Sequence, residues 1–124
     1  MALQGDNSQV SAVDFADLLR RLDNDRDLMR ELFVLFRQEL PGLENSLQEA
    51  ALRENMEGIQ TTGHRLKGML SSLSAKRAAS AASRLEELGD TGDKTGLQDA
   101  LLAFQREIVI LLAELDAGAE KATP

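Results

Sequence analysis

Apolar residues recur at spacings of three and four along most of the chain, which is the period of an amphipathic α-helix. No stretch of useful length alternates apolar and polar residues as a half-buried strand would. The clearest series is Leu97, Leu101, Phe104, Ile108, Leu111 and Leu115. This spacing is typical of a helix packed in a bundle, so the sequence predicts an all-α protein.

Capping residues mark the starts of two helices in the N-terminal part of the chain. Ser11 and Asp14 form a capping box before a short helix, and Asn24 and Asp27 form another before a long helix. Pro41 lies inside the long helix and predicts a kink, because proline lacks an N–H and clashes with the preceding turn. The apolar stripe of this helix is expected to contain Leu28, Leu32, Leu35, Phe36, Leu40, Leu43, Leu47 and Ala51.

Three further helices complete the predicted fold. Asn55 is expected to cap a helix over about 56–73, and Ser74 another over about 75–88. The residues from 89 to 96 contain three glycines and form a loop before the last helix. Four substantial helices with short links predict an up-down four-helix bundle, with the short N-terminal helix covering one end.

The length of 124 residues suits a single domain with one core. We expect the bundle domain to span 11–116, between flexible tails at 1–10 and 117–124. The side chains expected in the core are Leu32, Phe36, Leu43, Leu47, Ile59, Leu66, Leu70, Leu85, Leu101, Phe104, Ile108 and Leu111.

Composition excludes several classes of function. The chain has no cysteine, which excludes disulfides and thiolate zinc sites, and no acidic cluster has metal-ligand spacing. The net charge of -7 and the absence of Trp and Tyr argue against nucleic-acid binding. The apolar runs are too short to cross a bilayer, and the N-terminus lacks the features of a signal peptide. A cytoplasmic protein with no membrane contact is therefore expected.

The only histidine, His64, is expected to point away from the core. On a wheel of about 100° per residue it lies roughly 140° from the centre of the apolar stripe of its helix. That stripe consists of Ile59, Gly63, Leu66, Leu70 and Leu73. Gln60, Lys67, Gly68 and Ser71 share the face of His64.

This face has the chemistry of a phosphoryl acceptor. A neutral imidazole can attack phosphorus, and Lys67 at i+3 can approach the phosphoryl oxygens. Gly68 leaves space for a partner, at a cost of about 1 kcal/mol relative to alanine in mid-helix. The segment 58–85 contains five cations and no carboxylate, as an anion-handling site would favour. The residues alone leave open the plainer interpretation of a solvated, inert histidine.

The sequence His64-Arg65-Leu66-Lys67-Gly68 resembles the His-x-Leu-Lys-Gly signature of histidine-containing phosphotransfer (HPt) domains. The segment 27–32 resembles the start of that family's second helix, and Leu85-Glu86 resembles a pair in the helix after the active one. The similarity covers about 13–115. Two small residues depart from the family pattern, since Gly63 replaces the usual alanine and Ser74 a frequent glycine.

The resemblance implies a phosphorelay mechanism. A receiver domain with a phospho-aspartate and a magnesium ion would dock over His64, and the phosphoryl group would pass to Nε2 of the imidazole and then to a second receiver. The implied partners are response-regulator receiver domains or a hybrid histidine kinase, contacted in part through Gln60, Arg65 and Ser71. The chain itself needs no cofactor and shows no nucleotide-binding signature, so we expect a monomeric phosphoryl carrier without kinase activity.

Two other interpretations remain open at this point. The chain could be the phosphoacceptor domain of a chemotaxis-type kinase, although that class often has a second histidine in the following helix and this chain has none. A sensor-kinase dimerisation helix is disfavoured, because Arg65 stands where an acidic base would follow the histidine. The chain could also be a non-catalytic helical adaptor, and the exposure of His64 distinguishes this from a carrier.

Overall fold

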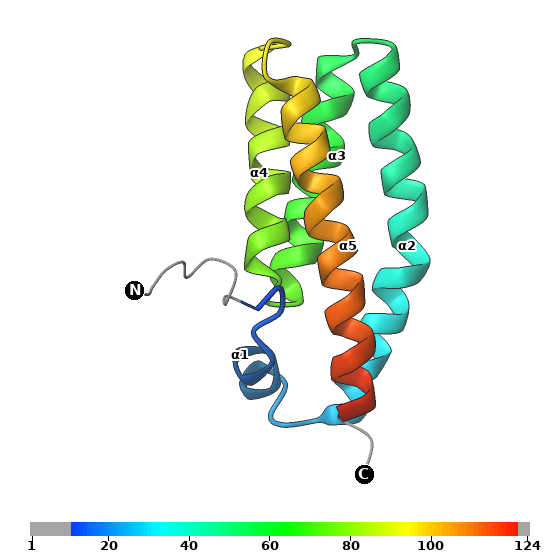
Figure 1. Ribbon diagram of the computed structural model, residues 1–124, viewed down its shortest axis with the longest axis vertical. Coiled ribbons are helices and arrows are strands. Elements are labelled where there is room, and N and C mark those ends of the chain that lie inside the picture. The colour runs from blue at the N-terminus through cyan, green and yellow to red at the C-terminus, as the bar shows by residue number, and fades with distance from the viewer. Residues whose placement is uncertain (1–10, 122–124) are drawn as a thin grey trace.

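The computed structural model describes the backbone of residues 11–121 and the side chains of residues 11–117. The helices are α1 (Phe15–Arg21), α2 (Arg26–Leu52), α3 (Met56–Ser72), α4 (Lys76–Thr91) and α5 (Leu97–Lys121). No strand occurs within this range. In Figure 1, α2 to α5 lie along the long axis with successive helices running in opposite directions, and α1 lies below the turn between α3 and α4. The predicted all-α bundle with a short covering helix is confirmed.

The last helix is longer than the expected end of the bundle at 116 implied. Helix α5 continues to Lys121, five residues past the position where the bundle was expected to end. The expected tail at 1–10 lies outside the described residues, as does the end of the chain at 122–124.

The caps of α1 and α2 are not the predicted capping boxes. Asp14 itself is the N-cap of α1, where its carboxylate accepts from the Asp17 amide at 3.0 Å. Asp25 caps α2 and accepts from the Leu28 amide at 3.0 Å, whereas Asn24 adopts a left-handed φ of 61° in the preceding turn. In both places a single carboxylate satisfies one of the free amides in the first turn, which is the function of an N-cap.

Ser74 is not the N-cap of α4, since Ala75 holds that position without a side-chain bond. Ser74 is 2% exposed with a left-handed φ of 56°, and its hydroxyl donates to Asp17 Oδ2 at 2.8 Å. The same hydroxyl accepts from Arg21 Nη1 at 2.9 Å, while the Ser74 carbonyl accepts from the Asp14 amide at 3.0 Å. Ser74 therefore ties α1 to the turn between α3 and α4.

The remaining helix boundaries are close to the predicted ones. Asn55 caps α3 as expected, accepting from the Gly58 amide at 3.1 Å. Helix α4 extends to Thr91, three residues beyond the predicted end, and Gly92 follows with a left-handed φ of 71° that glycine adopts without strain. Helix α2 continues through Pro41, and the kink there stays a prediction.

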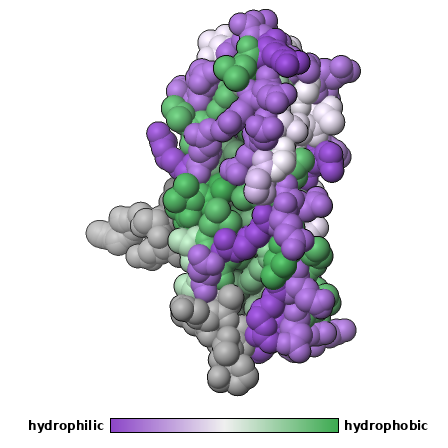
Figure 2. Space-filling view, turned by 90° about the vertical axis from the view of Figure 1, so that its right-hand side faces the viewer, coloured by the Kyte–Doolittle hydropathy of each residue, from purple (hydrophilic) through white to green (hydrophobic). Residues whose placement is uncertain are grey.

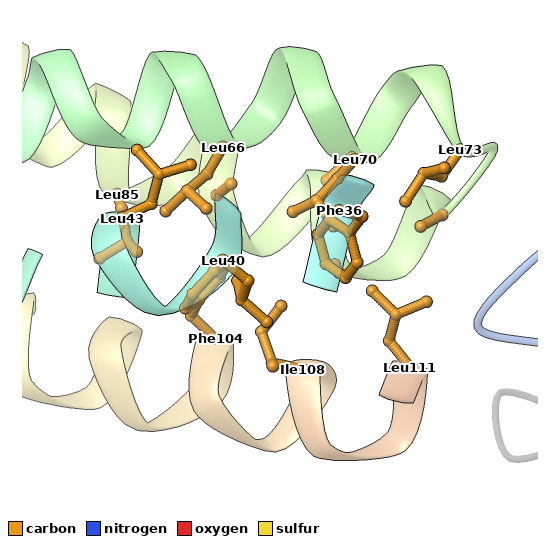
Figure 3. Packing of buried hydrophobic residues seen from close by; sticks show 14 of the residues in the cluster. Phe36, Leu40, Leu43, Leu66, Leu70, Leu73, Leu85, Phe104, Ile108 and Leu111 are labelled. Atoms are coloured by element: carbon orange, nitrogen blue, oxygen red, sulfur yellow. The ribbon is translucent and has the colours of Figure 1, made fainter. Parts of the chain in front are cut away.

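The core lies between the four long helices and contains the predicted residues with one exception, Leu32, which is only half-buried. Figure 3 shows Leu66 and Leu70 of α3 facing side chains from α2 and α5. The predicted stripe of α2 is wrong at Leu35, which is 54% exposed, and at Leu28, which is also exposed. Met29 and Phe33 are buried instead.

Large apolar side chains also remain at the surface of α2 and α5. They are Leu28, Val34, Leu35, Leu52, Leu102, Val109 and Ile110. Figure 2 shows the side on which α2 lies in Figure 1, where apolar patches alternate with hydrophilic side chains. No helix within the described residues is both long and apolar enough to span a membrane.

Truncation of the core should destabilise the bundle strongly. Leu66 and Phe104 are at most 1% exposed, so Leu66→Ala and Phe104→Ala should each lower the free energy of unfolding by about 2–5 kcal/mol. Val109→Ala is the matched control on an exposed position and should stay within about 0.5 kcal/mol. Urea titration followed by circular dichroism measures all three, and equal losses for core and control would contradict the assigned core.

Candidate functional site

The exposed face of α3 carries His64. Ile59, Leu66 and Leu70 on the opposite face are fully buried, which fixes the rotation of the helix about its axis. The His64 side chain is 68% exposed as a result. The predicted outward orientation of the histidine is confirmed.

A carboxylate from the neighbouring helix holds the imidazole. Glu86 of α4 places Oε2 2.8 Å from His64 Nδ1 and Oε1 2.7 Å from Lys67 Nζ. An ionised carboxylate only accepts hydrogen bonds, so Nδ1 carries a proton in this contact. In the neutral ring the lone pair then lies on Nε2. Glu86 thus selects the nitrogen that is available as a nucleophile.

The same contacts keep Glu86 ionised. The hydrogen bond from Lys67, followed by the one from His64, lowers the pKa of Glu86 below its usual value, against a smaller opposing effect of desolvation. Because the folded-state pKa is lowered, the stabilising effect of the carboxylate is present at neutral pH and is lost as pH falls through that lowered pKa. The proton on Nδ1 therefore has a charged acceptor throughout the neutral range.

Two glycines allow α3 and α4 to approach closely enough for these contacts. A β-carbon on Gly63 would lie 2.8 Å from the Glu86 nitrogen and 3.2 Å from the Ala82 oxygen. A β-carbon on Gly89 would lie 2.4 Å from the Gln60 nitrogen. The mid-helix Gly63 therefore serves close helix packing, and it brings the backbone of Glu86 next to the residue that precedes His64.

Glu86 was missed as a site residue in the sequence. The absence of carboxylates from 58–85 predicted a site without acidic groups, and this prediction is wrong because the site uses the residue immediately after that segment. The similarity of Leu85-Glu86 to the family pattern was the one feature of the sequence that pointed to Glu86. Leu85 is fully buried, so its neighbour is held in a defined direction.

The other predicted site residues lie around His64 on the same side of α3. Gly68 is exposed, and a β-carbon there would meet nothing within 4 Å, so the surface one turn after the histidine is open. Gln60 is half-buried and donates from Nε2 to Asp90 Oδ1 at 3.1 Å, whereas Arg65 and Ser71 are exposed. Their contacts with a partner stay predictions.

The side chains around His64 are suited to nucleophilic chemistry. Within the part of the chain that the structure describes, no group of three or more His, Asp or Glu side chains could hold a metal ion. The site consists instead of one exposed imidazole, one carboxylate and one ammonium group in contact. This combination can orient a ring nitrogen and offer positive charge to an approaching anion.

Comparison with known families gives an independent result. The family model described as "Hpt domain" matches residues 31–118, well over half of the chain. The match includes all of α3 and α4, and therefore His64, Lys67, Gly68 and Glu86. Searches of curated proteins and of solved structures found no match.

The contact with Glu86 predicts the tautomer of His64. In the unaltered protein at a pH where the ring is neutral, ¹⁵N NMR should show predominantly the Nδ1–H form. Glu86→Leu removes the acceptor and should shift the population toward Nε2–H. Glu87→Leu is the control, because Glu87 is the next residue along α4 and makes no contact with His64. A tautomer ratio that does not respond to Glu86→Leu would show that this carboxylate does not orient the ring.

Proposed function

We propose, because the chain belongs to the Hpt domain family, that His64 is the residue on which it carries a phosphoryl group between receiver domains. Hpt domains are phosphocarriers of phosphorelay signalling and not kinases. His64 is the only histidine in the chain, and its exposure disfavours the alternative of an inert adaptor. The main support for the proposal is that the imidazole is exposed while its Nδ1 is hydrogen-bonded to Glu86.

The proposed transfer begins with Nε2. Its lone pair attacks the phosphorus of a receiver's aspartyl phosphate, so that an N–P bond forms while the P–O bond to the aspartate breaks and the carboxylate leaves. Positive charge develops on the ring, and the ionised Glu86 at Nδ1 offsets it. The magnesium ion that would neutralise the phosphoryl oxygens is expected on the receiver. Transfer to a second receiver reverses these steps.

Lys67 can act on the transfer in two ways. In the free protein its ammonium group lies 2.7 Å from Glu86 Oε1, so it is already paired before a phosphoryl group arrives. It must move or share its hydrogens in order to contact phosphoryl oxygens. We therefore infer that Lys67 raises the transfer rate without being essential. It also keeps Glu86 charged, through the hydrogen bond that lowers the pKa of Glu86.

The partners and the setting are part of the proposal. We infer that a receiver domain, either separate or within a hybrid histidine kinase, is the donor and a second receiver the acceptor, with the chain acting as a monomer in the cytoplasm. The phosphoacceptor domain of a chemotaxis-type kinase would use the same histidine. Incubation with phosphorylated receivers and, separately, with an ATP-binding kinase domain distinguishes the two contexts.

Substitutions should show that His64 accepts the phosphoryl group and that Lys67 only raises the transfer rate. His64→Gln should remove all acid-labile label received from a ³²P-labelled receiver, because no other imidazole is present. Lys67→Ala should slow transfer roughly ten- to a hundredfold, since charge in a partly dehydrated complex is worth about 2–3 kcal/mol. Lys67→Arg should retain part of the rate, because it keeps the charge but changes the shape.

A distant lysine provides the control for charge removal. Lys94 lies in the loop between α4 and α5 and pairs with Glu54 in the turn between α2 and α3, and Lys94→Ala should transfer at the normal rate. Circular dichroism checks that every variant is folded. Label on His64→Gln would refute the phosphocarrier assignment, and unfolding of Lys67→Ala would show that the lysine acts on structure.

The open surface at Gly68 should be needed for docking. Gly68→Gln places a side chain beside His64 and should slow transfer from the receiver strongly, while better helix propensity raises the free energy of unfolding by up to about 1 kcal/mol. Gly42→Gln is the stability control, because Gly42 is likewise exposed within a helix and a β-carbon there would also meet nothing within 4 Å. A normal transfer rate for Gly68→Gln would contradict the steric role.

A further inference from the structure

A groove beside His64 shares only Lys67 with the mechanism above. It lies between α3 and α4, is closed at one end by α1, and has a volume of about 410 Å³. We call it the serine groove. Its lining includes Arg21, Lys67, Ser71, Lys76, Ser80 and Ser83. Lys67 belongs both to this groove and to the Glu86 contact, so the groove begins next to the histidine.

The groove contains unused hydrogen-bond donors. The hydroxyls of Ser71, Ser80 and Ser83 have no hydrogen-bond partner among the described residues, in contrast to Ser74 at the end of the groove. A serine hydroxyl can rotate to donate to an approaching acceptor. The groove therefore offers three adaptable donors along one side of the site.

The groove is also cationic within an acidic protein. Lys76 is 75% exposed and lies 3.9 Å from Asp14, a distance at which an exposed pair is weak. Arg21 is 3.9 Å from Asp17, the one carboxylate of the groove, and Asp17 already accepts from Ser74 and pairs with Arg20. The segment 58–85 adds no acidic residue, although the chain has a net charge of -7. Because Lys67 is paired with Glu86, the positive charge that an approaching acidic group meets here comes mainly from Lys76 and Arg21.

A docked partner must cover this groove. A standard interface buries about 800 Å² on each partner, which corresponds to a patch of about 30 Å across. Ser71 is seven residues after His64, or about 10 Å along the helix. Any domain that brings a phospho-aspartate to His64 therefore also places some of its own surface over the serine groove.

We propose that the serine groove receives an acidic side chain of the receiver domain, which orients that domain over His64 and favours receivers with an Asp or Glu at the matching position. This inference rests on the proposed function, since it needs a receiver as partner. The carboxylate of the receiver would accept from the free serine hydroxyls and lie near Lys76 and Arg21. Contacts of this kind act mainly on association rate and partner choice.

The test uses the full chain with two substitutions that place negative charge in the groove, Lys76→Glu and Ser80→Asp. Both positions are exposed, so neither change disturbs the core. Arg106→Glu is the control. It makes the same charge reversal as Lys76→Glu, on the exposed surface of α5 outside the groove. Each variant is mixed with the phosphorylated receiver that transfers fastest to the unaltered protein. Each is also treated with phosphoramidate, a phosphoryl donor too small to need a docking surface.

The informative quantity is the receiver transfer rate divided by the phosphoramidate labelling rate. At about 50 mM salt this ratio should fall roughly tenfold for Lys76→Glu and for Ser80→Asp, and the loss should shrink at about 500 mM salt, where charges are screened. Arg106→Glu should leave the ratio within about twofold of the unaltered protein.

The outcomes separate this inference from the proposed function. If the unaltered protein exchanges phosphoryl groups with receivers but the groove variants keep its ratio, only the serine groove assignment is wrong. If both rates fall together in the groove variants, the substitutions act on the imidazole and the docking assignment is again wrong. If no receiver labels the unaltered protein, the proposed function fails and the inference fails with it.

Discussion

The backbones of α3 and α4 approach so closely at Gly63 that a β-carbon there would lie 2.8 Å from the Glu86 nitrogen. This approach places a carboxylate from α4 against the imidazole that follows Gly63 on α3. Helix α4 is suited to it, because the residues packed inward include Ala78, Ala79 and Ala82. A glycine in mid-helix costs about 1 kcal/mol in propensity, and the geometry of the site is the gain that offsets it.

The chemistry that follows is divided between this chain and its proposed partner. The buried side chains of Leu66 and Leu70 fix the rotation of α3 about its axis, and Glu86 fixes the orientation of the His64 ring. A ring held in this way loses little further freedom on entering a transfer complex. In the proposed mechanism the chain supplies an oriented nucleophile on a rigid helix, while the metal and the aspartyl phosphate are expected on the receiver.

The sequence predicted well the parts of the fold that depend on residues close to one another in the chain. The helices, the Asn55 cap and most of the core follow from residue spacing and capping chemistry. The sequence of α2 has two adjacent apolar stripes, one with Leu35 and one with Met29 and Phe33. The sequence alone does not show that the stripe with Leu35 faces solvent. Ser74 looks like a local cap, but side chains from α1 draw it into a tertiary contact. The contact between Glu86 and His64 depends on the register of α3 and α4, and no local sequence pattern shows that register.

The most direct test of this account is the position of the phosphoryl group on the ring. The protein can be labelled with ¹⁵N in its single histidine, phosphorylated by a receiver, and examined by ¹⁵N and ³¹P NMR. Since Glu86 holds Nδ1, the account predicts an N–P bond at Nε2 with the proton retained on Nδ1. A phosphoryl group on Nδ1 would contradict it, because that nitrogen could not then donate to Glu86.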